Sequence, residues 1–196
     1  SDLTAFRMRF PNSDGTYDGF GIYWIPRARA LEREKKDRIP YLTWANQGWI
    51  RLTDGDETDY EQVRADIMEV SRTHKFIQLA VDYKFQGAET SQYLEKNGIK
   101  RVDFQQSVSS YTAPTREYLR LINAKLLYHG GDPVLKWNAS NLMLYEMTDG
   151  ACKPSKDKSQ NKIDAIVADI MAIGLSMAGK VSNRKSVYES RGALML

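Results

Sequence analysis

The amino-acid sequence predicts an α/β fold in which a mixed β-sheet is flanked by helices. Short, mostly apolar segments alternate with segments whose apolar residues recur at helical spacing, and this alternation is typical of parallel strands joined by helices. An aromatic-rich hairpin signal near the N-terminus adds antiparallel strands. With 196 residues, 42% hydrophobic and 27% charged, the chain can bury one sizeable core, so we expect residues 1–196 to form a single domain.

The first half of the chain is expected to contain a hairpin, two helices and a buried strand. A turn signal from Asn12 to Gly15 separates the two hairpin strands. Asp59 is placed to cap the second helix. The strand that follows this helix is short and apolar and ends on Asp82. The expected ranges are residues 3–10 and 17–25 for the hairpin, 27–37 and 60–73 for the helices, and 75–82 for the strand.

The second half continues the alternation. Pro114 stands where the first turn of a helix tolerates proline. Residues 134–137 could be helical or extended, and residues 149–160, rich in glycine, lysine and serine, are expected to form a mobile basic loop. The expected helices cover about residues 87–97, 115–124 and 161–178, and the expected strands cover residues 99–104 and 141–147.

The composition of the chain limits the kinds of metal site and partner that it can have. The single cysteine, Cys152, excludes an internal disulfide and a zinc site with several thiolates, so a metal would be held mainly by oxygen, which suits Mg²⁺ or Mn²⁺. Residues 151–196 carry eight Lys or Arg against four Asp or Glu, a net charge of +4. This asymmetry fits a polyanionic partner, although solubility explains it about as well. Neither a membrane span nor a signal peptide is evident, which favours the cytosol.

Two aspartates are the candidates for a reactive centre. Asp82 is predicted at the carboxyl end of a central strand, where open α/β sheets place ligands and catalytic groups. Asp164 is predicted in the first turn of the last helix. Taken singly, each is more often a cap or a partner of the helix dipole. If the helix packs on the sheet, however, the two carboxylates approach each other and require a cation between them.

Other polar residues have competing interpretations. Lys153, Lys156, Lys158 and Lys162 precede or adjoin Asp164 and could hold a DNA backbone, or could form a solvated loop. His129 lies in a glycine turn and favours a structural hydrogen bond over proton transfer. The polar residues 105–107 and 112–116 favour helix capping over DNA contact, and Trp44 and Trp137 favour the core over base stacking.

Several segments together resemble the nuclease domain of the large terminase subunit of tailed bacteriophages. Their order and spacing carry the resemblance, which covers nearly the whole chain. The segments are SDLTA at 1–5, DRIPY at 37–41, AVDY at 80–83, APTRE at 113–117, HGGDPVLKW at 129–137, Asn141, KPSKDKS at 153–159 and KIDAIV at 162–167. The resemblance implies a ribonuclease H-like fold and an endonuclease that uses two Mg²⁺ or Mn²⁺ ions to cleave concatemeric double-stranded viral DNA during genome packaging.

The resemblance also assigns residues and partners. Asp82 and Asp164 match two metal-binding, catalytic acids of the family, and Asp2 matches a nearby acidic position and is a third candidate ligand. A further metal-binding aspartate of the family lies on a strand just before the segment that begins here at Ser1, so we expect that first strand to be lacking and the activity of this chain alone to be weak or absent. Asn161 stands where family members often have glutamate.

The expected partners are DNA, the portal protein and the small terminase subunit, in the cytoplasm of the host cell. A phosphate-binding loop of the GxxxxGK[ST] type is missing from these residues, so the packaging ATPase is not part of them. Two other functions stay open: a non-catalytic docking module of the packaging motor, and another ribonuclease H-like DNA nuclease such as a junction resolvase or transposase.

Overall fold

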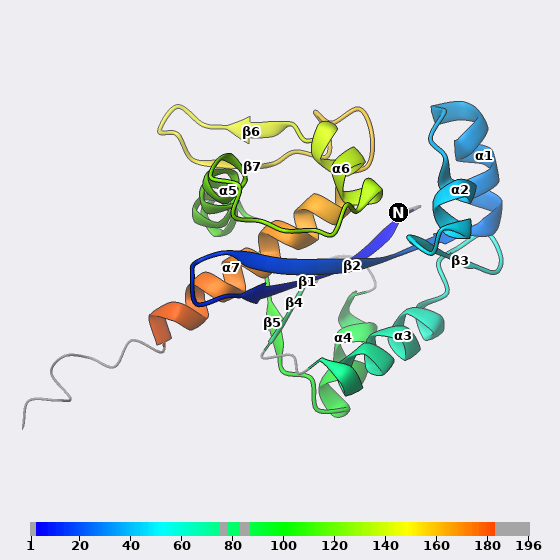
Figure 1. Ribbon diagram of the computed structural model, residues 1–196, viewed down its shortest axis with the longest axis horizontal. Coiled ribbons are helices and arrows are strands. Elements are labelled where there is room, and N and C mark those ends of the chain that lie inside the picture. The colour runs from blue at the N-terminus through cyan, green and yellow to red at the C-terminus, as the bar shows by residue number, and fades with distance from the viewer. Residues whose placement is uncertain (1–2, 75–77, 83–86, 183–196) are drawn as a thin grey trace, which may run out of the picture.

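The computed structural model describes residues 3–74, 78–82 and 87–182 and confirms the α/β fold (Figure 1). The strands are β1 (Thr4–Pro11), β2 (Tyr17–Pro26), β3 (Ile50–Thr53), β4 (Leu79–Val81), β5 (Arg101–Asp103), β6 (Leu144–Glu146) and β7 (Cys152–Pro154). The helices are α1 (Arg27–Asp37), α2 (Tyr41–Asn46), α3 (Tyr60–Thr73), α4 (Gly87–Lys96), α5 (Val108–Asn123), α6 (Pro133–Ser140) and α7 (Asp164–Ser182).

The strands form three hydrogen-bonded groups. The predicted hairpin is confirmed: β1 pairs with β2 in an antiparallel arrangement, and β3 extends this sheet as a parallel neighbour of β2. The strands β4 and β5 pair in parallel, as expected for strands that flank a helix, and β6 and β7 form a second hairpin. Within the described residues, no strand pairing joins β1 to β4. One edge of β1 therefore faces β4 without forming a ladder with it.

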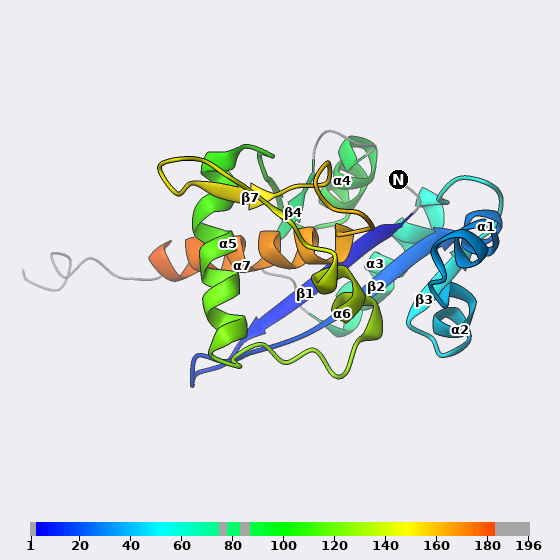
Figure 2. The same ribbon diagram turned by 90° about the horizontal axis from the view of Figure 1, so that it is seen from above.

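The long hairpin has an apolar layer on each face. Successive residues of a strand point to opposite faces, so Tyr23 and Trp24, both fully buried, belong to different apolar clusters. The cluster around Tyr23 includes residues of α5, α6 and α7, whereas that around Trp24 includes residues of α3 and α4. Figure 1 shows α5 and α6 above the hairpin and α3 and α4 below it, and Figure 2 shows α7 crossing the hairpin at an angle.

Buried charges join the hairpin to the helices of the first cluster. Arg7 on β1 donates from Nε to Asp169 on α7 at 3.2 Å and from Nη1 to Asp132 at 2.8 Å. Arg9 also contacts Asp169, and the Tyr118 hydroxyl donates to the same carboxylate at 2.7 Å. Because a buried charge is tolerated only when it is paired and hydrogen-bonded, this network fixes α7 against β1.

The sequence analysis missed two elements and misplaced the start of a helix. The segments that form α2 and β3 were not predicted as elements. Helix α5 begins at Val108, where Ser107 caps it by accepting a hydrogen bond from Ser110 N, so Pro114 lies inside the helix and not in its first turn. Pro114 is buried against α7 at Gly174, where an added Cβ would meet the proline ring at 3.0 Å. Tertiary packing thus overrides the ordinary penalty for proline within a helix.

The predicted basic loop is only partly a loop. Its first part forms β7, in which Cys152 N donates to the Thr112 hydroxyl at 3.1 Å and the same hydroxyl donates to Cys152 O. The last helix begins at Asp164, three residues later than predicted, and is described as far as Ser182. The predicted strand 75–82 is shorter: residues 79–81 form β4, and residues 75–77 lie outside the described residues.

Candidate active site

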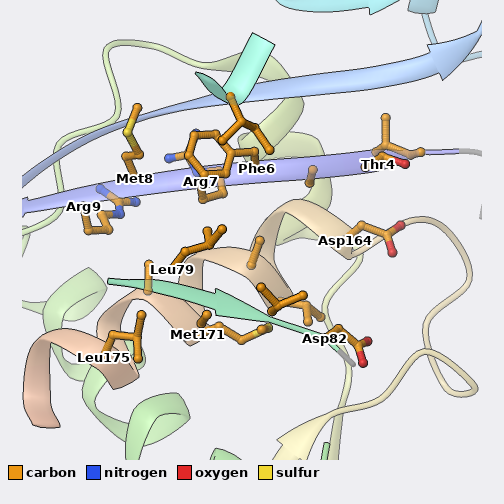
Figure 3. Close-up of a pocket in the computed structure, with 18 of the residues that line it drawn as sticks. Thr4, Phe6, Arg7, Met8, Arg9, Leu79, Asp82, Asp164, Met171 and Leu175 are labelled. Carbon is orange, nitrogen blue, oxygen red and sulfur yellow. The ribbon is translucent and has the colours of Figure 1, made fainter. Parts of the chain in front are cut away.

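A cavity of about 1340 Å³ lies between β1 and β4. Every residue of β1 lines one side of it, and residues 78–82 line the other. Side chains of α7 close a further wall at helical spacing, among them Val167, Met171 and Leu175. In Figure 3 the two strands run in opposite directions along the cavity: Thr4, at the start of β1, lies at the same end as Asp82, which follows β4.

The structure brings Asp82 and Asp164 to this one cavity. Both carboxylates lie at the same end of it, while Arg9 and Leu175 lie at the opposite end (Figure 3). Asp82 is partly buried at the carboxyl end of β4, and Asp164 is the first residue of α7. A strand-end acid and a helix N-terminal acid therefore lie at the same end of one cavity. Carboxylate oxygens gathered in this way are the ligands that Mg²⁺ and Mn²⁺ prefer.

Two asparagines that the sequence analysis did not single out as site residues hold the start of α7. The fully buried Asn138 of α6 accepts a hydrogen bond from Ala165 N at 3.0 Å, and its amide nitrogen donates to Val134 O. Asn141 donates to Lys162 O at 3.0 Å, just before Asp164. A helix N-terminus leaves backbone N–H groups without partners, so a side-chain acceptor there fixes the direction of the helix. The only sequence signal for this role is that both residues lie at or beside the quoted motifs.

The four lysines do not behave as one group. Lys156 Nζ forms an ion pair with Asp164 Oδ1 at 2.7 Å. Lys153 Nζ lies 3.4 Å from the carbonyl oxygen of Gln106, and Lys158 Nζ lies 5.2 Å from the centre of the Tyr145 ring. Lys156 and Lys162 line the cavity. Lys156 is therefore the member whose ammonium group is placed directly on a candidate metal ligand.

The described residues offer few ligands for a metal at this cavity. Among the described residues, no group of three or more His, Cys, Asp or Glu side chains could hold an ion. The candidate ligand Asp2 lies outside the described residues. Asp82 and Asp164 supply carboxylate oxygens at one end of the cavity, and oxygen ligands of this kind suit a divalent cation. The charge of Asp164 is already neutralised by the ammonium group of Lys156. Complete coordination of two ions needs more donors than Asp82 and Asp164 supply.

Residues 1–180 match the family described as the terminase large subunit, endonuclease domain. The chain belongs to this family. As a terminase nuclease domain, it is 32% identical over 178 residues to the large subunit of the terminase of Enterobacteria phage HK97, covering 89% of this chain and 35% of that protein. It is also 27% identical over 161 residues to the protein YmfN of Escherichia coli strain K12, covering 79% of this chain and 35% of YmfN.

A solved structure agrees with this assignment. The crystal structure of the HK97 bacteriophage large terminase matches 89% of this terminase nuclease domain with a TM-score of 0.82 and 30% sequence identity, and the match covers 36% of that chain. The ribonuclease H-like fold predicted from the sequence is confirmed. The domain spans about a third of the length of the curated relatives it matches. In the described part of the chain, no helix is long and apolar enough to cross a membrane.

The remaining candidates of the terminase nuclease domain have structural surroundings. Trp44 is buried, and Trp137 packs against it in the core, as predicted. His129 is different: its Nδ1 is buried and has no hydrogen-bond partner among the described residues, so the expected structural hydrogen bond is not made there. Burial, followed by the charge of Lys136, lowers the pKa of His129 despite the opposing effect of Asp132. This shift favours the neutral form of the imidazole.

Proposed function

We propose that this domain is a metal-dependent endonuclease that cleaves concatemeric double-stranded viral DNA during genome packaging. The observation that carries the proposal is the position of Asp82 and Asp164 at one end of a cavity, on two elements that are far apart in sequence. Membership of the terminase nuclease family supplies the reaction class. A nuclease with this substrate would act in the cytoplasm of the host cell, with the portal protein and the small terminase subunit as partners.

In this proposal Asp82 and Asp164 are ligands of two Mg²⁺ or Mn²⁺ ions. Such ions, when bound, activate water and stabilise the leaving oxygen of a phosphodiester. The contribution of the chain is to hold its carboxylates in place: β4 presents Asp82, and the contact of Asn138 with the first turn of α7 orients Asp164. Burial of Ile163, the residue before α7, and of Ile166 in its first turn keeps this turn on the sheet.

The cavity supports a second part of the proposal, namely that one more extended strand belongs between β1 and β4. β1 has eight residues and an edge that faces the cavity, and β4 runs in the opposite direction along the other side. A strand between them could run antiparallel to β1 and parallel to β4, which would join two of the sheets. It would end beside Asp82 and Asp164, where it would bring a further carboxylate. Asp2 is a candidate for the same role.

Basic side chains in the segment that leads into α7 are proposed to hold the substrate. Lys153, Lys156, Lys158 and Lys162 lie in or beside the segment that leads into α7. Contacts from lysine to phosphate are independent of sequence and weaken with salt. This surface therefore suits a nuclease whose affinity for DNA does not depend on base recognition.

The proposal is tested with supercoiled plasmid and Mn²⁺. We expect weak nicking or none by the 196-residue chain and measurable nicking by a polypeptide extended upstream of Ser1. In the extended polypeptide, Asp82→Asn and Asp164→Asn should lose about a hundredfold or more of the rate, the scale seen when an electrostatic stabiliser is removed from an active site. The matched control is Asp157→Asn, an exposed aspartate seven residues before Asp164 that the proposal does not use.

Binding of Mn²⁺, measured by calorimetry without DNA, separates this function from a docking module. Affinity that falls in both site variants but not in Asp157→Asn supports the metal centre. A parent chain that binds no Mn²⁺, even when it is extended upstream of Ser1, would instead favour a non-catalytic docking role.

A further inference from the structure

We propose that Lys156 is a tethered cation that neutralises Asp164 while no divalent ion is bound, gives way to that ion, and then contacts the phosphate of the bound DNA. This inference rests on the proposed function, because it assumes that Asp164 is a metal ligand. It adds a specific role for one of the four lysines. Lys156 is a positioning and substrate-binding residue in this scheme, not a metal ligand.

The ion pair is unlike an ordinary surface contact. The Lys156 ammonium lies 2.7 Å from Asp164 Oδ1, a distance typical of a charge-assisted hydrogen bond. The Asp164 side chain is only 15% exposed, whereas that of Lys156 is 56% exposed. The aspartate is therefore held in place at the cavity, while most of the lysine stem is free to move through solvent. If the pair separates, the lysine side chain is the partner that moves.

The backbone of Lys156 is fixed by a buried serine. Ser155 is 8% exposed, and its hydroxyl accepts from Lys158 N at 3.3 Å, while its carbonyl oxygen accepts from Ser159 N at 3.1 Å. Ser155 N in turn donates to Met143 O at 2.9 Å, beside β6. The turn that carries Lys156 is thus anchored from both sides. Its ammonium group stays within reach of the acidic end of the cavity whichever partner it contacts.

This arrangement creates competition between two cations. A divalent ion that binds Asp164 meets the ammonium group at contact distance, where like charges disfavour each other even at the screening found near a protein surface. When Lys156 is released from Asp164, its ammonium group remains beside the metal centre. A DNA phosphate bound at that centre would bring negative charge close to this ammonium group. The same side chain should therefore weaken metal binding in the absence of DNA and strengthen DNA binding.

The experiment compares Lys156→Met with Lys158→Met, which removes the same charge from the same turn but from a lysine placed over Tyr145. Calorimetry without DNA should show Mn²⁺ binding about three- to tenfold tighter in Lys156→Met and unchanged in Lys158→Met. Fluorescence anisotropy with a short duplex should show weaker binding for Lys156→Met, and a slope against log salt that is reduced by about 1. Lys156→Arg, which keeps the charge, should retain the Mn²⁺ affinity of the parent chain.

The outcomes distinguish this inference from the function on which it rests. Unchanged or weaker Mn²⁺ binding in Lys156→Met, in a parent chain whose Mn²⁺ affinity depends on Asp164, overturns the role of Lys156 and leaves the metal centre standing. A parent chain without measurable Mn²⁺ binding overturns both. Equal tightening in Lys156→Met and Lys158→Met would show a general effect of net charge and would also overturn the specific role.

Discussion

At the scale of single residues, Asp169 shows how a charge can belong to the core. Its side chain is fully buried, yet it accepts hydrogen bonds from Arg7, Arg9 and Tyr118. Burial raises the pKa of this carboxyl, but the two arginines lower it more, so the pKa lies below its ordinary value of 3.8. The stabilisation that follows is therefore fully present above about pH 4 and is lost as the pH falls below that value.

Replacing Asp169 by Asn should strongly destabilise the protein. The substitution leaves two buried arginines with one countercharge fewer, a change that costs about 3–5 kcal/mol of the free energy of unfolding. Urea unfolding at pH 7 measures the loss, with the exposed Asp157→Asn as the control. Below pH 4 the difference between the parent and Asp169→Asn should shrink, because the parent then loses the same stabilisation. A difference that stays constant from pH 7 to pH 3 would contradict this account.

At the scale of elements, the position of α7 decides where Asp164 lies. The helix starts at Asp164 and packs on β1 through the charge network and its apolar face, and its first turn is held by Asn138 from α6. The position of the Asp164 side chain thus depends on β1, α6 and α7, which are separate in the sequence. A substitution in α6 should therefore alter the candidate site even though the substituted residue does not line the cavity.

Asn138→Ala tests this coupling. Loss of the acceptor leaves the buried Ala165 N–H without a hydrogen bond, which costs about 1–3 kcal/mol of stability. Plasmid nicking and Mn²⁺ affinity should fall as well, because the first turn of α7 loses its fixed direction. The matched control is Asn123→Ala, an exposed asparagine at the end of α5. Lower stability with unaltered Mn²⁺ affinity would separate Asn138 from the site.

At the scale of the whole molecule, the sheets are interrupted where the cavity lies. The sheet of β1, β2 and β3 and the sheet of β4 and β5 both pack on α7, yet no ladder joins them among the described residues. An unpaired strand edge is a ready acceptor for another strand. The proposed additional strand would join these two sheets into one and would fill the cavity except at its acidic end.

Hydrogen exchange can test for the additional strand. In the 196-residue chain, amides of β1 that pair with β2 should be protected, whereas alternate amides that face the cavity should exchange faster. In a polypeptide extended upstream of Ser1, these alternate amides should become protected as well, because they would donate to the new strand. The amides of β3 provide the internal control. Equal exchange from β1 in both polypeptides would argue against the strand.

The elements that depend on local chemistry were predicted well from the sequence. The hairpin of β1 and β2 followed from its turn residues and aromatic strands, and α3 followed from the Asp59 cap and its apolar spacing. The elements that were missed or misplaced depend on distant contacts. β7 forms because Thr112 and β6 supply hydrogen bonds, and α5 extends through Pro114 because α7 offers a glycine at the crossing.

The candidate site, like the fold, could be predicted from the sequence only in part. The sequence by itself selected Asp82 and Asp164 as the candidate carboxylates, because Asp82 follows a short apolar strand, Asp164 opens an amphipathic helix, and the quoted motifs occur in a specific order. Only the tertiary structure decided that both acids share one end of a cavity, and that the ammonium group of Lys156 is paired with Asp164. The physical reason is range: turns, caps and periodicity act over a few residues, whereas the direction of a side chain at a helix terminus is set by packing between elements that are distant in the sequence.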